Sequence, residues 1–284
     1  FTRSESMIGT WLRGKQRDQV ILASKVAGPR RPLNWIRGGP SSLDNDNIRS
    51  AVEGSLRRLG TDYLDLYQLH WPERNVPMFG EYQFDPGRES DALPIRAQLE
   101  TLAALIREGK IRHVGLSNET PWGVMEFLRL TREHGLPRVV SIQNSYSLIN
   151  RVFEFGLSEI TYREQLSLLA YSPLAFGLLS GKYWKSPSAD GRVTRFKGFA
   201  QRYEKPGVQP AVAAYATLAE KFGMSPAQMA LSFVYHRWFM GSTIIGATTL
   251  AQLGENLDAW DKPLAADALA AIEQLHLSQM NPAP

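Results

Sequence analysis

Short apolar runs alternate along the chain with longer amphipathic segments. The most prominent run, residues 62–72, is rich in leucine and aromatic residues and ends in His70, Trp71 and Pro72. This composition predicts a buried strand that stops near His70, because proline cannot donate to a strand ladder. Five further runs predict strands, over residues 20–26, 113–118, 139–144, 166–174 and 242–249.

Apolar residues between these runs recur with a helical period. The clearest segment begins at Ser42 or Asp44, carries Ile48 and Val52 on its apolar face, and ends at Gly60. Helices are predicted over residues 4–12, 44–59, 93–107, 121–134, 154–164, 210–222, 226–235, 250–260 and 265–276. Segments rich in proline, glycine or polar residues predict loops over residues 28–45, 73–91 and 184–203.

The alternation of strands and helices predicts an α/β fold built from parallel β/α units. Polar residues gather where the predicted strands end, namely Lys25, His70, Ser117, Asn118, Gln143, Asn144, Tyr171, Ser172 and Thr248. This arrangement is typical of a (β/α)8 TIM barrel, whose active face lies at the carboxyl ends of its strands. A doubly wound sheet is disfavoured, because the chain contains no G-x-G-x-x-G and no phosphate-binding P-loop motif.

The predicted strands number six, whereas a closed barrel of this class needs eight. The chain also opens on Phe1 and not on methionine. We therefore expect a single barrel domain over residues 1–284 that is incomplete at its N-terminus, with about two β/α units missing before Phe1.

The amino-acid composition and net charge exclude or disfavour several classes of function. The chain has 284 residues, 43% of them hydrophobic and 21% charged, with a net charge of +4. Its basic residues are scattered, which disfavours nucleic-acid binding, while the mild positive charge favours an anionic small molecule. Cysteine is absent, which excludes disulfides, thiolate catalysis and cysteine-ligated metals and fits a cytoplasmic protein.

The sequence pattern also disfavours two further classes, metal-binding proteins and membrane proteins. Acidic residues show no metal-ligand spacing, so no metal is predicted. No apolar run approaches the roughly 18 residues of a membrane helix, so no membrane association is expected.

Lys25 and His70 suggest proton chemistry. Each lies at the end of a predicted strand, and consecutive strands of a parallel barrel are neighbours. A buried lysine beside a phenol stays charged and lowers the phenol's pKa, and an imidazole can orient a carbonyl or assist proton transfer. The alternatives are a lysine that reaches solvent along its aliphatic stem and a core histidine bound to a backbone carbonyl.

Several runs together resemble a known family. They are ASK at residues 23–25, YLDLYQLHWP at 63–72, GKIRHVGLSN at 109–118, QN at 143–144, AYSPL at 170–174, GLLSGK at 177–182, and IGAT at 245–248 followed by Gln252 and Asn256. In this order, and over nearly the whole chain, they resemble an aldo-keto reductase, most closely the bacterial and potassium-channel β-subunit-like branch.

The resemblance implies a TIM barrel that binds NADPH without a Rossmann motif, and a catalytic tetrad of which Lys25 and His70 are the matching lysine and histidine. It implies that Ser117, Asn118 and Gln143 hold the nicotinamide carboxamide and that Tyr171 stacks on the nicotinamide ring. It assigns the pyrophosphate to Ser172, Leu174, Gly177, Ser180 and Lys182, the adenosine end to Gly246, Thr248, Gln252, Glu255 and Asn256, and the 2′-phosphate to Arg192 or Arg195.

One part of the family pattern is missing from the sequence. The stretch that carries the family's catalytic aspartate and tyrosine has no counterpart here, and neither Tyr67 nor Tyr171 is placed to replace that tyrosine. Trp71 either lines the substrate pocket or packs at the rim. The function expected is NADPH-dependent reduction of small aldehydes or ketones, and the alternative is a regulatory, redox-sensing subunit that binds NADP(H) with little or no turnover.

Overall fold

The computed structural model describes residues 3–29, 35–196, 198 and 200–284. The chain divides into two compact units, which are described separately below. The N-terminal unit comprises Phe1–Val76 and Phe84–Gln143, and the C-terminal unit comprises Pro77–Gln83 and Asn144–Pro284. Residues 30–34 of the predicted loop 28–45 lie outside the described residues.

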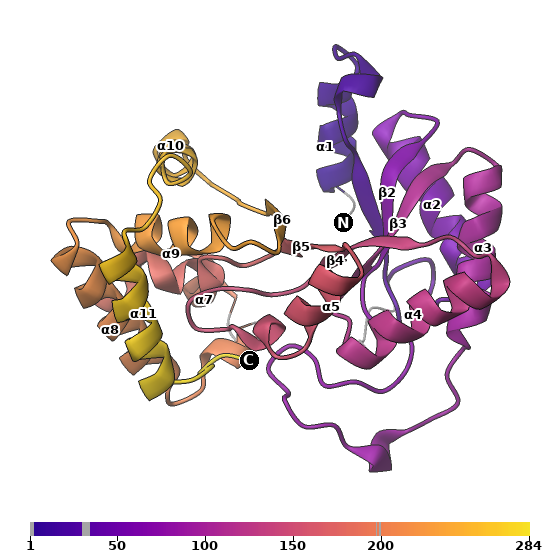
Figure 1. Ribbon diagram of the computed structural model, residues 1–284. Coiled ribbons are helices and arrows are strands. Elements are labelled where there is room, and N and C mark those ends of the chain that lie inside the picture. Colours follow the sequence, from indigo (N-terminus) through magenta and orange to yellow (C-terminus); the bar gives the residue numbers. More distant parts are fainter. Residues whose placement is uncertain (1–2, 30–34, 197, 199) are drawn as a thin grey trace. The chain divides into compact units, whose positions relative to one another are not determined.

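Parallel strands form the centre of the N-terminal unit. They pair in chain order as β1 (Ala23–Val26), β2 (Leu64–Leu69), β3 (Ile111–Ser117) and β4 (Val139–Gln143). The helices of this unit are α1 (Arg3–Leu12), α2 (Asn45–Leu59), α3 (Ile95–Arg107) and α4 (Pro121–His134), with 3-10 turns at Arg17–Gln19 and Pro86–Arg88. Helices α2, α3 and α4 follow one another along one side of these strands (Figure 1).

Helix α2 shows how local sequence sets these boundaries. The Asp44 carboxylate accepts a hydrogen bond from the Asn47 amide and caps the start of the helix. Gly60 ends the helix in the left-handed conformation, with φ of 65°, which glycine adopts without steric cost. Ile48 and Val52 between these caps are fully buried, as the apolar period predicts.

The register of the strands separates the two faces of the sheet. Ser24 pairs with Tyr67, and the Ser24 hydroxyl is bonded to Glu5 of α1, so this row faces the helices. Lys25 pairs with Gln68 and therefore lies on the opposite face, because successive side chains of a strand alternate. This second face carries the candidate chemistry of the unit.

The C-terminal unit contains the parallel pair β5 (Ser167–Ala170) and β6 (Met240–Thr243). Its helices are α5 (Leu157–Arg163), α6 (Lys182–Lys185), α7 (Arg192–Arg195), α8 (Val208–Lys221), α9 (Pro226–Tyr235), α10 (Leu250–Asp258) and α11 (Ala266–Ser278), with 3-10 turns at Val152–Glu154, Ala175–Ser180 and Gln201–Tyr203. Helix α8 packs against α9 and α11, and α10 packs against α9 (Figure 1).

The described residues form six strands, as predicted, and the strand pairs given above are all parallel. Two expectations need correction. The predicted loop 184–203 contains α7 and a 3-10 turn, and the end of α6. Strand β6 ends at Thr243, so Thr248 lies in the following loop and not at a strand end.

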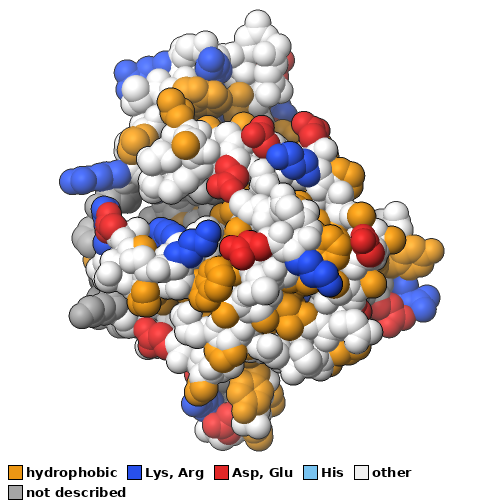
Figure 2. All heavy atoms as spheres, turned by 90° about the vertical axis from the view of Figure 1, so that its left-hand side faces the viewer, with side chains coloured by type: hydrophobic (Ala, Val, Ile, Leu, Met, Phe, Trp, Pro, Cys, Tyr) orange, Lys and Arg blue, Asp and Glu red, His pale blue; other side chains and the backbone are white. Residues whose placement is uncertain are grey.

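Among the described residues, no helix combines the length and the apolar character needed to cross a bilayer. On the face drawn in Figure 2, basic side chains lie among acidic and apolar ones, and the coloured residues form no broad basic patch.

An ionic network around the buried Arg151 holds the start of the C-terminal unit together. Arg151, whose side chain is 4% exposed, donates to both Glu154 and Glu273. Burial raises the pKa of Glu154, but hydrogen bonds from Arg151 and Tyr146 outweigh it and hold the pKa of this carboxyl below its usual value. Because the folded-state pKa is lowered, the Glu154 charge stabilises the fold above its unfolded pKa of about 4.3, and this contribution is lost as the pH falls through the folded-state pKa.

We therefore expect Glu154→Gln to lower the free energy of unfolding at pH 7 by about 2 kcal/mol, the value typical of charge-assisted hydrogen bonds. The difference from the unmodified protein should shrink as the pH falls below about 4. Urea unfolding at a series of pH values measures both effects. Glu159→Gln, in the exposed pair with Arg163, is the matched control and should change little. An equal loss for Glu154→Gln at every pH would contradict the argument.

Candidate functional site

The ends of β2, β3 and β4 are tied together by hydrogen bonds around Asn118. The Asn118 side-chain amide donates to the backbone oxygen of His70 at 2.9 Å, and its backbone N–H donates to the Gln143 oxygen at 3.1 Å. The Ser117 hydroxyl donates to the same Gln143 oxygen at 2.8 Å. The structure thus brings together four of the residues that the sequence predicts to form the site.

Asn118 can make these contacts because of its backbone conformation. Its φ is 53°, in the left-handed region, which asparagine tolerates better than most residues. This turn lets one residue reach the strand on either side of β3. The backbone of His70 is held in the same way from β1, since its N–H donates to the Val26 oxygen at 3.0 Å.

Lys25 lies one residue before the end of β1, on the face opposite the helices. Its ammonium group makes no hydrogen bond to the described part of the chain. Burial lowers the pKa of Lys25, because the charged form loses hydration. Lys25 and His70 lie on the same face of neighbouring strands, since Lys25 pairs with Gln68, two residues before His70.

Trp71 is placed differently from its neighbour His70. The indole is 2% exposed and donates to the Pro29 backbone oxygen at 2.6 Å. A Cβ on Gly28 would lie 3.1 Å from the indole ring, so the ring packs tightly over this glycine. These contacts are those of a packing residue, and the substrate role of Trp71 stays a prediction.

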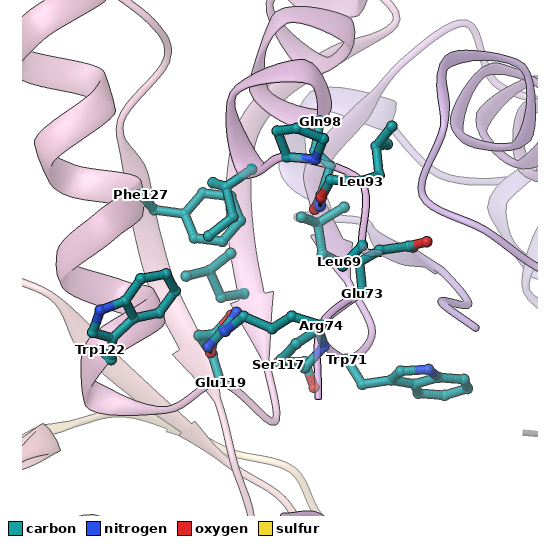
Figure 3. Close-up of a pocket in the computed structure, with 15 residues that line it drawn as sticks. Leu69, Trp71, Glu73, Arg74, Leu93, Gln98, Ser117, Glu119, Trp122 and Phe127 are labelled. Atoms are coloured by element: carbon teal, nitrogen blue, oxygen red, sulfur yellow. Dashed lines mark hydrogen bonds and ion pairs between the residues drawn. The ribbon is translucent and has the colours of Figure 1, made fainter. Parts of the chain in front are cut away.

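A pocket of about 170 Å³ opens in the N-terminal unit between the ends of β2 and β3 and the first turns of α3 and α4. Apolar side chains such as Leu69, Leu93 and Phe127 line most of it (Figure 3). Arg74 reaches across it to Glu119, and the Glu119 side chain is only 3% exposed. This ion pair joins the loop after β2 to the loop after β3.

In the C-terminal unit, the predicted pyrophosphate residues form one tight turn after β5. Ser172, Ala175, Phe176 and Gly177 all have positive φ values, between 48° and 93°. The Ser180 hydroxyl donates to the Gly177 oxygen at 2.7 Å. The Leu174 oxygen accepts the Gly177 and Leu179 amides, and the Lys182 ammonium lies within 3.2 Å of the Asp190 oxygen.

Tyr171 and Arg192 are attached to this turn, whereas Arg195, the other candidate arginine, pairs with Asp190. Tyr171 begins it, with its backbone N–H donating to Asn144. The Arg192 guanidinium lies 4.0 Å from the centre of the Phe176 ring, and so is attached to the turn. Arg195 instead forms a bidentate pair with Asp190 on the surface.

The residues predicted for the adenosine end gather around α10. The Gln252 side-chain oxygen accepts from the backbone and the hydroxyl of Thr248, at 2.9 and 3.0 Å. Asn256 is 3% exposed and donates weakly to the Gly246 oxygen at 3.4 Å. Glu255 accepts the Ser225 hydroxyl. All five predicted residues thus lie within one local cluster.

Comparison with known proteins identifies the family to which these motifs belong. The sequence profile of the aldo/keto reductase family matches residues 1–276. The chain belongs to the aldo/keto reductase family. It is 46% identical to the protein Tas of Escherichia coli K12 over 283 residues, which cover 99% of this chain and 82% of Tas.

Two further relatives show the spread of this family. An aldo-keto reductase of Babesia bovis is 39% identical over 279 residues, covering 93% of this chain and 98% of that protein. The NADH-specific methylglyoxal reductase of Escherichia coli K12 is 28% identical over 270 residues, covering 91% and 75%. Membership in this family confirms three predictions. They are the TIM-barrel fold class, oxidoreductase activity on small aldehydes or ketones, and the use of a nicotinamide cofactor.

Three residues near the site were not singled out by the sequence. Arg74 and Glu119 were missed because charges in loops usually face solvent, although Glu119 directly follows a predicted strand and Arg74 lies four residues after His70. Gln68 was missed as a separate feature because it stands inside an apolar run. A polar residue in such a run was the available signal. Among the described residues, no group of three His, Asp or Glu side chains converges as a metal site would require.

Breaking the Arg74–Glu119 pair should be costly. We expect Arg74→Met to lower the free energy of unfolding by about 3 kcal/mol, because it leaves the buried Glu119 charge without its partner. Urea unfolding with an unchanged denaturant slope measures the loss. Arg96→Met removes one member of an exposed pair with Glu100 and should cost no more than about 0.5 kcal/mol. Equal losses in the two variants would refute a structural role for the buried pair.

Proposed function

We propose that this protein reduces small aldehydes or ketones with NADPH, and that Lys25 and His70 are its catalytic groups. The overall change is carbonyl plus NADPH plus a proton to alcohol plus NADP⁺. The observation that supports this most directly is the arrangement on one face of the N-terminal unit. There Lys25 and His70 share the face of neighbouring strands, and Asn118 ties His70 to Ser117 and Gln143.

The residues present fit a nicotinamide cofactor. In the N-terminal unit, Ser117, Asn118 and Gln143 offer amide and hydroxyl groups at strand ends, which suit a carboxamide. In the C-terminal unit, Lys182 and Arg192 lie beside the left-handed turn after β5, and their positive charge suits a phosphate. We infer that Tyr171 stacks on the nicotinamide ring, and that the α10 cluster of Gly246, Thr248, Gln252, Glu255 and Asn256 holds the adenosine end.

The cofactor, when bound, supplies the hydride that adds to the carbonyl carbon. The chain's own residues then act on the carbonyl oxygen. The His70 ring can donate a hydrogen bond to that oxygen and orient the substrate. The Lys25 ammonium places a positive charge where negative charge develops, and its partial burial strengthens that interaction. The resemblance implies a tyrosine as the proton donor, and we assign no residue of this chain to that role.

Replacement of the catalytic groups tests this proposal in the full-length protein. We expect Lys25→Met and His70→Ala each to lower kcat for 4-nitrobenzaldehyde by at least about 100-fold, the lower range for a positioned proton-transfer group. NADPH binding, measured by fluorescence titration, should survive both changes. Lys15→Met is the matched control, because Lys15 lies on the surface over Trp11. Unchanged kcat in Lys25→Met would refute the assignment.

The same assay separates the reductase from the alternative function. A regulatory, redox-sensing subunit would bind NADP(H) tightly and show little turnover with any generic aldehyde in the unmodified protein. Steady NADPH oxidation that depends on the aldehyde would exclude that alternative.

Cofactor choice depends on the 2′-phosphate of NADPH. We propose that Arg192, held against Phe176, contacts this phosphate, whereas Arg195 is engaged by Asp190. Arg192→Ala should raise KM for NADPH about ten-fold, consistent with the loss of one charged hydrogen bond, and should leave KM for NADH unchanged. Arg195→Ala serves as the control. Equal effects on both cofactors would show that Arg192 does not read the 2′-phosphate.

A further inference from the structure

Four positions form one row across the strands of the N-terminal unit. Lys25 of β1 pairs with Gln68 of β2, Gln68 pairs with Gly115 of β3, and Gly115 pairs with Ser141 of β4. Partners in a parallel sheet project from the same face, so Lys25, Gln68 and Ser141 share the face opposite the helices. Neighbouring strands are about 4.8 Å apart, which keeps adjacent side chains within reach of each other.

Gly115 lets the polar side chains on either side converge. A Cβ at this position would lie 2.7 Å from the Ser141 hydroxyl oxygen and 3.2 Å from the Gln68 Cγ atom. The first distance is closer than real Cβ contacts, so the two side chains occupy the space that any larger residue at position 115 would need. Glycine is required here by packing and not by backbone conformation.

The polar atoms of this row are buried without partners. Gln68 is 1% exposed and Ser141 is 6% exposed. Neither atom of the Gln68 amide, nor the Ser141 hydroxyl, has a hydrogen bond to any described residue. Leaving such a group unsatisfied destabilises the fold, so native proteins usually satisfy buried groups of this kind with ordered water.

Lys25 stands at the end of this row and has the complementary requirement. Its ammonium carries three N–H donors, and burial lowers its pKa. The charged groups nearest in the fold face elsewhere. Glu5 and Arg58 pair on the helix face beside Ser24, and Asp65 pairs with Arg17 and Arg112 near the start of β2. Two titratable groups lie on the same face as Lys25, namely His70 at the end of β2 and His113 of β3, which pairs with Leu66.

We propose that Gln68 and Ser141 hold one or two ordered water molecules in this row, and that this water links the Gln68 carbonyl oxygen to the Lys25 ammonium. Such water accepts hydrogen bonds from Lys25 and is itself held by the amide and the hydroxyl, so every polar group of the row is satisfied. Gln68 is then a positioning residue that keeps Lys25 charged. The catalytic consequence rests on the role proposed above for Lys25, whereas the water site itself does not.

A crystal structure of the full-length protein, at a resolution that shows ordered water, tests the site without reference to activity. We expect water within hydrogen-bond distance of at least two of the three atoms Gln68 Oε1, Gln68 Nε2 and Ser141 Oγ. A dry row would overturn the proposal. A direct bond from Gln68 to Lys25 or to another side chain, with no water, would overturn it as well.

Substitution at position 68 tests the link to Lys25. Gln68→Met removes the amide at similar volume, so the Lys25 ammonium should become less well solvated. The pKa of the alkaline limb of the kcat profile should then fall by about one unit. Gln68→Glu places a carboxylate in the row and should move this limb to higher pH.

Gln98→Met is the matched control for the loss of a buried amide. Gln98 is 2% exposed on α3, where its side chain donates to the Leu93 oxygen, and its replacement should leave the profile unchanged. Urea unfolding confirms that each variant folds. If Gln68→Met folds and keeps the profile of the unmodified protein, Gln68 does not act on Lys25. Loss of activity in Lys25→Met together with that result would leave the proposed function intact and overturn only this inference.

Discussion

The alternation of side chains in paired parallel strands is the constraint on which the N-terminal unit depends. Because successive residues point to opposite faces, the pairing of Lys25 with Gln68 decides at once that Lys25 and His70 share one face and that Ser24 and Tyr67 share the other. A shift by a single residue would exchange the faces. A slip of β1 would turn Lys25 towards the helices, where Glu5 and Ser55 now bind Ser24, and would turn Ser24 towards the face that carries His70.

The ends of the strands need more than backbone pairing to stay aligned, because ladder hydrogen bonds stop there. Two different devices take over on the two faces. Asn118 uses a left-handed backbone and its amide to hold the loops after β2 and β4. Arg74 and Glu119 join the loops after β2 and β3 from the helix side, through an ion pair that is largely shielded from water. The backbone of His70 is held directly by Asn118 and by Val26 of β1.

The sequence predicted the helices, the strands and the ends of the strands better than it predicted which side chains contact each other. The caps of α2 could be read directly, since Asp44 and Gly60 act through their own backbone, and the strand ends at Lys25, His70 and Ser117 follow from apolar runs that stop. The short helix α7 was missed, because it has only four residues and is stabilised in part by a side chain ten residues away in the sequence. Its first turn is bound by the Tyr183 hydroxyl and by Thr194. Thr248 was placed at a strand end because an apolar run continued past the true end of β6 at Thr243. Periodicity tells which face a residue occupies but not which partner it meets, so the isolation of Gln68 could not be foreseen.

The turn after β5, to which we assign the pyrophosphate of the cofactor, holds several residues in a strained backbone conformation. Ser172, Ala175 and Phe176 adopt the left-handed conformation, although none of them is a glycine. Each such residue costs on the order of 1–3 kcal/mol and persists only where the surroundings enforce it. Part of that enforcement is visible, since the Leu174 oxygen accepts two amides and Phe176 lies between Arg192 and Tyr203. Strain of this kind is not needed to connect a strand to a helix, because a single glycine would serve. The strained turn instead brings the Lys182 and Arg192 side chains beside it, and their positive charge suits an anionic ligand, which a simple connection would not require.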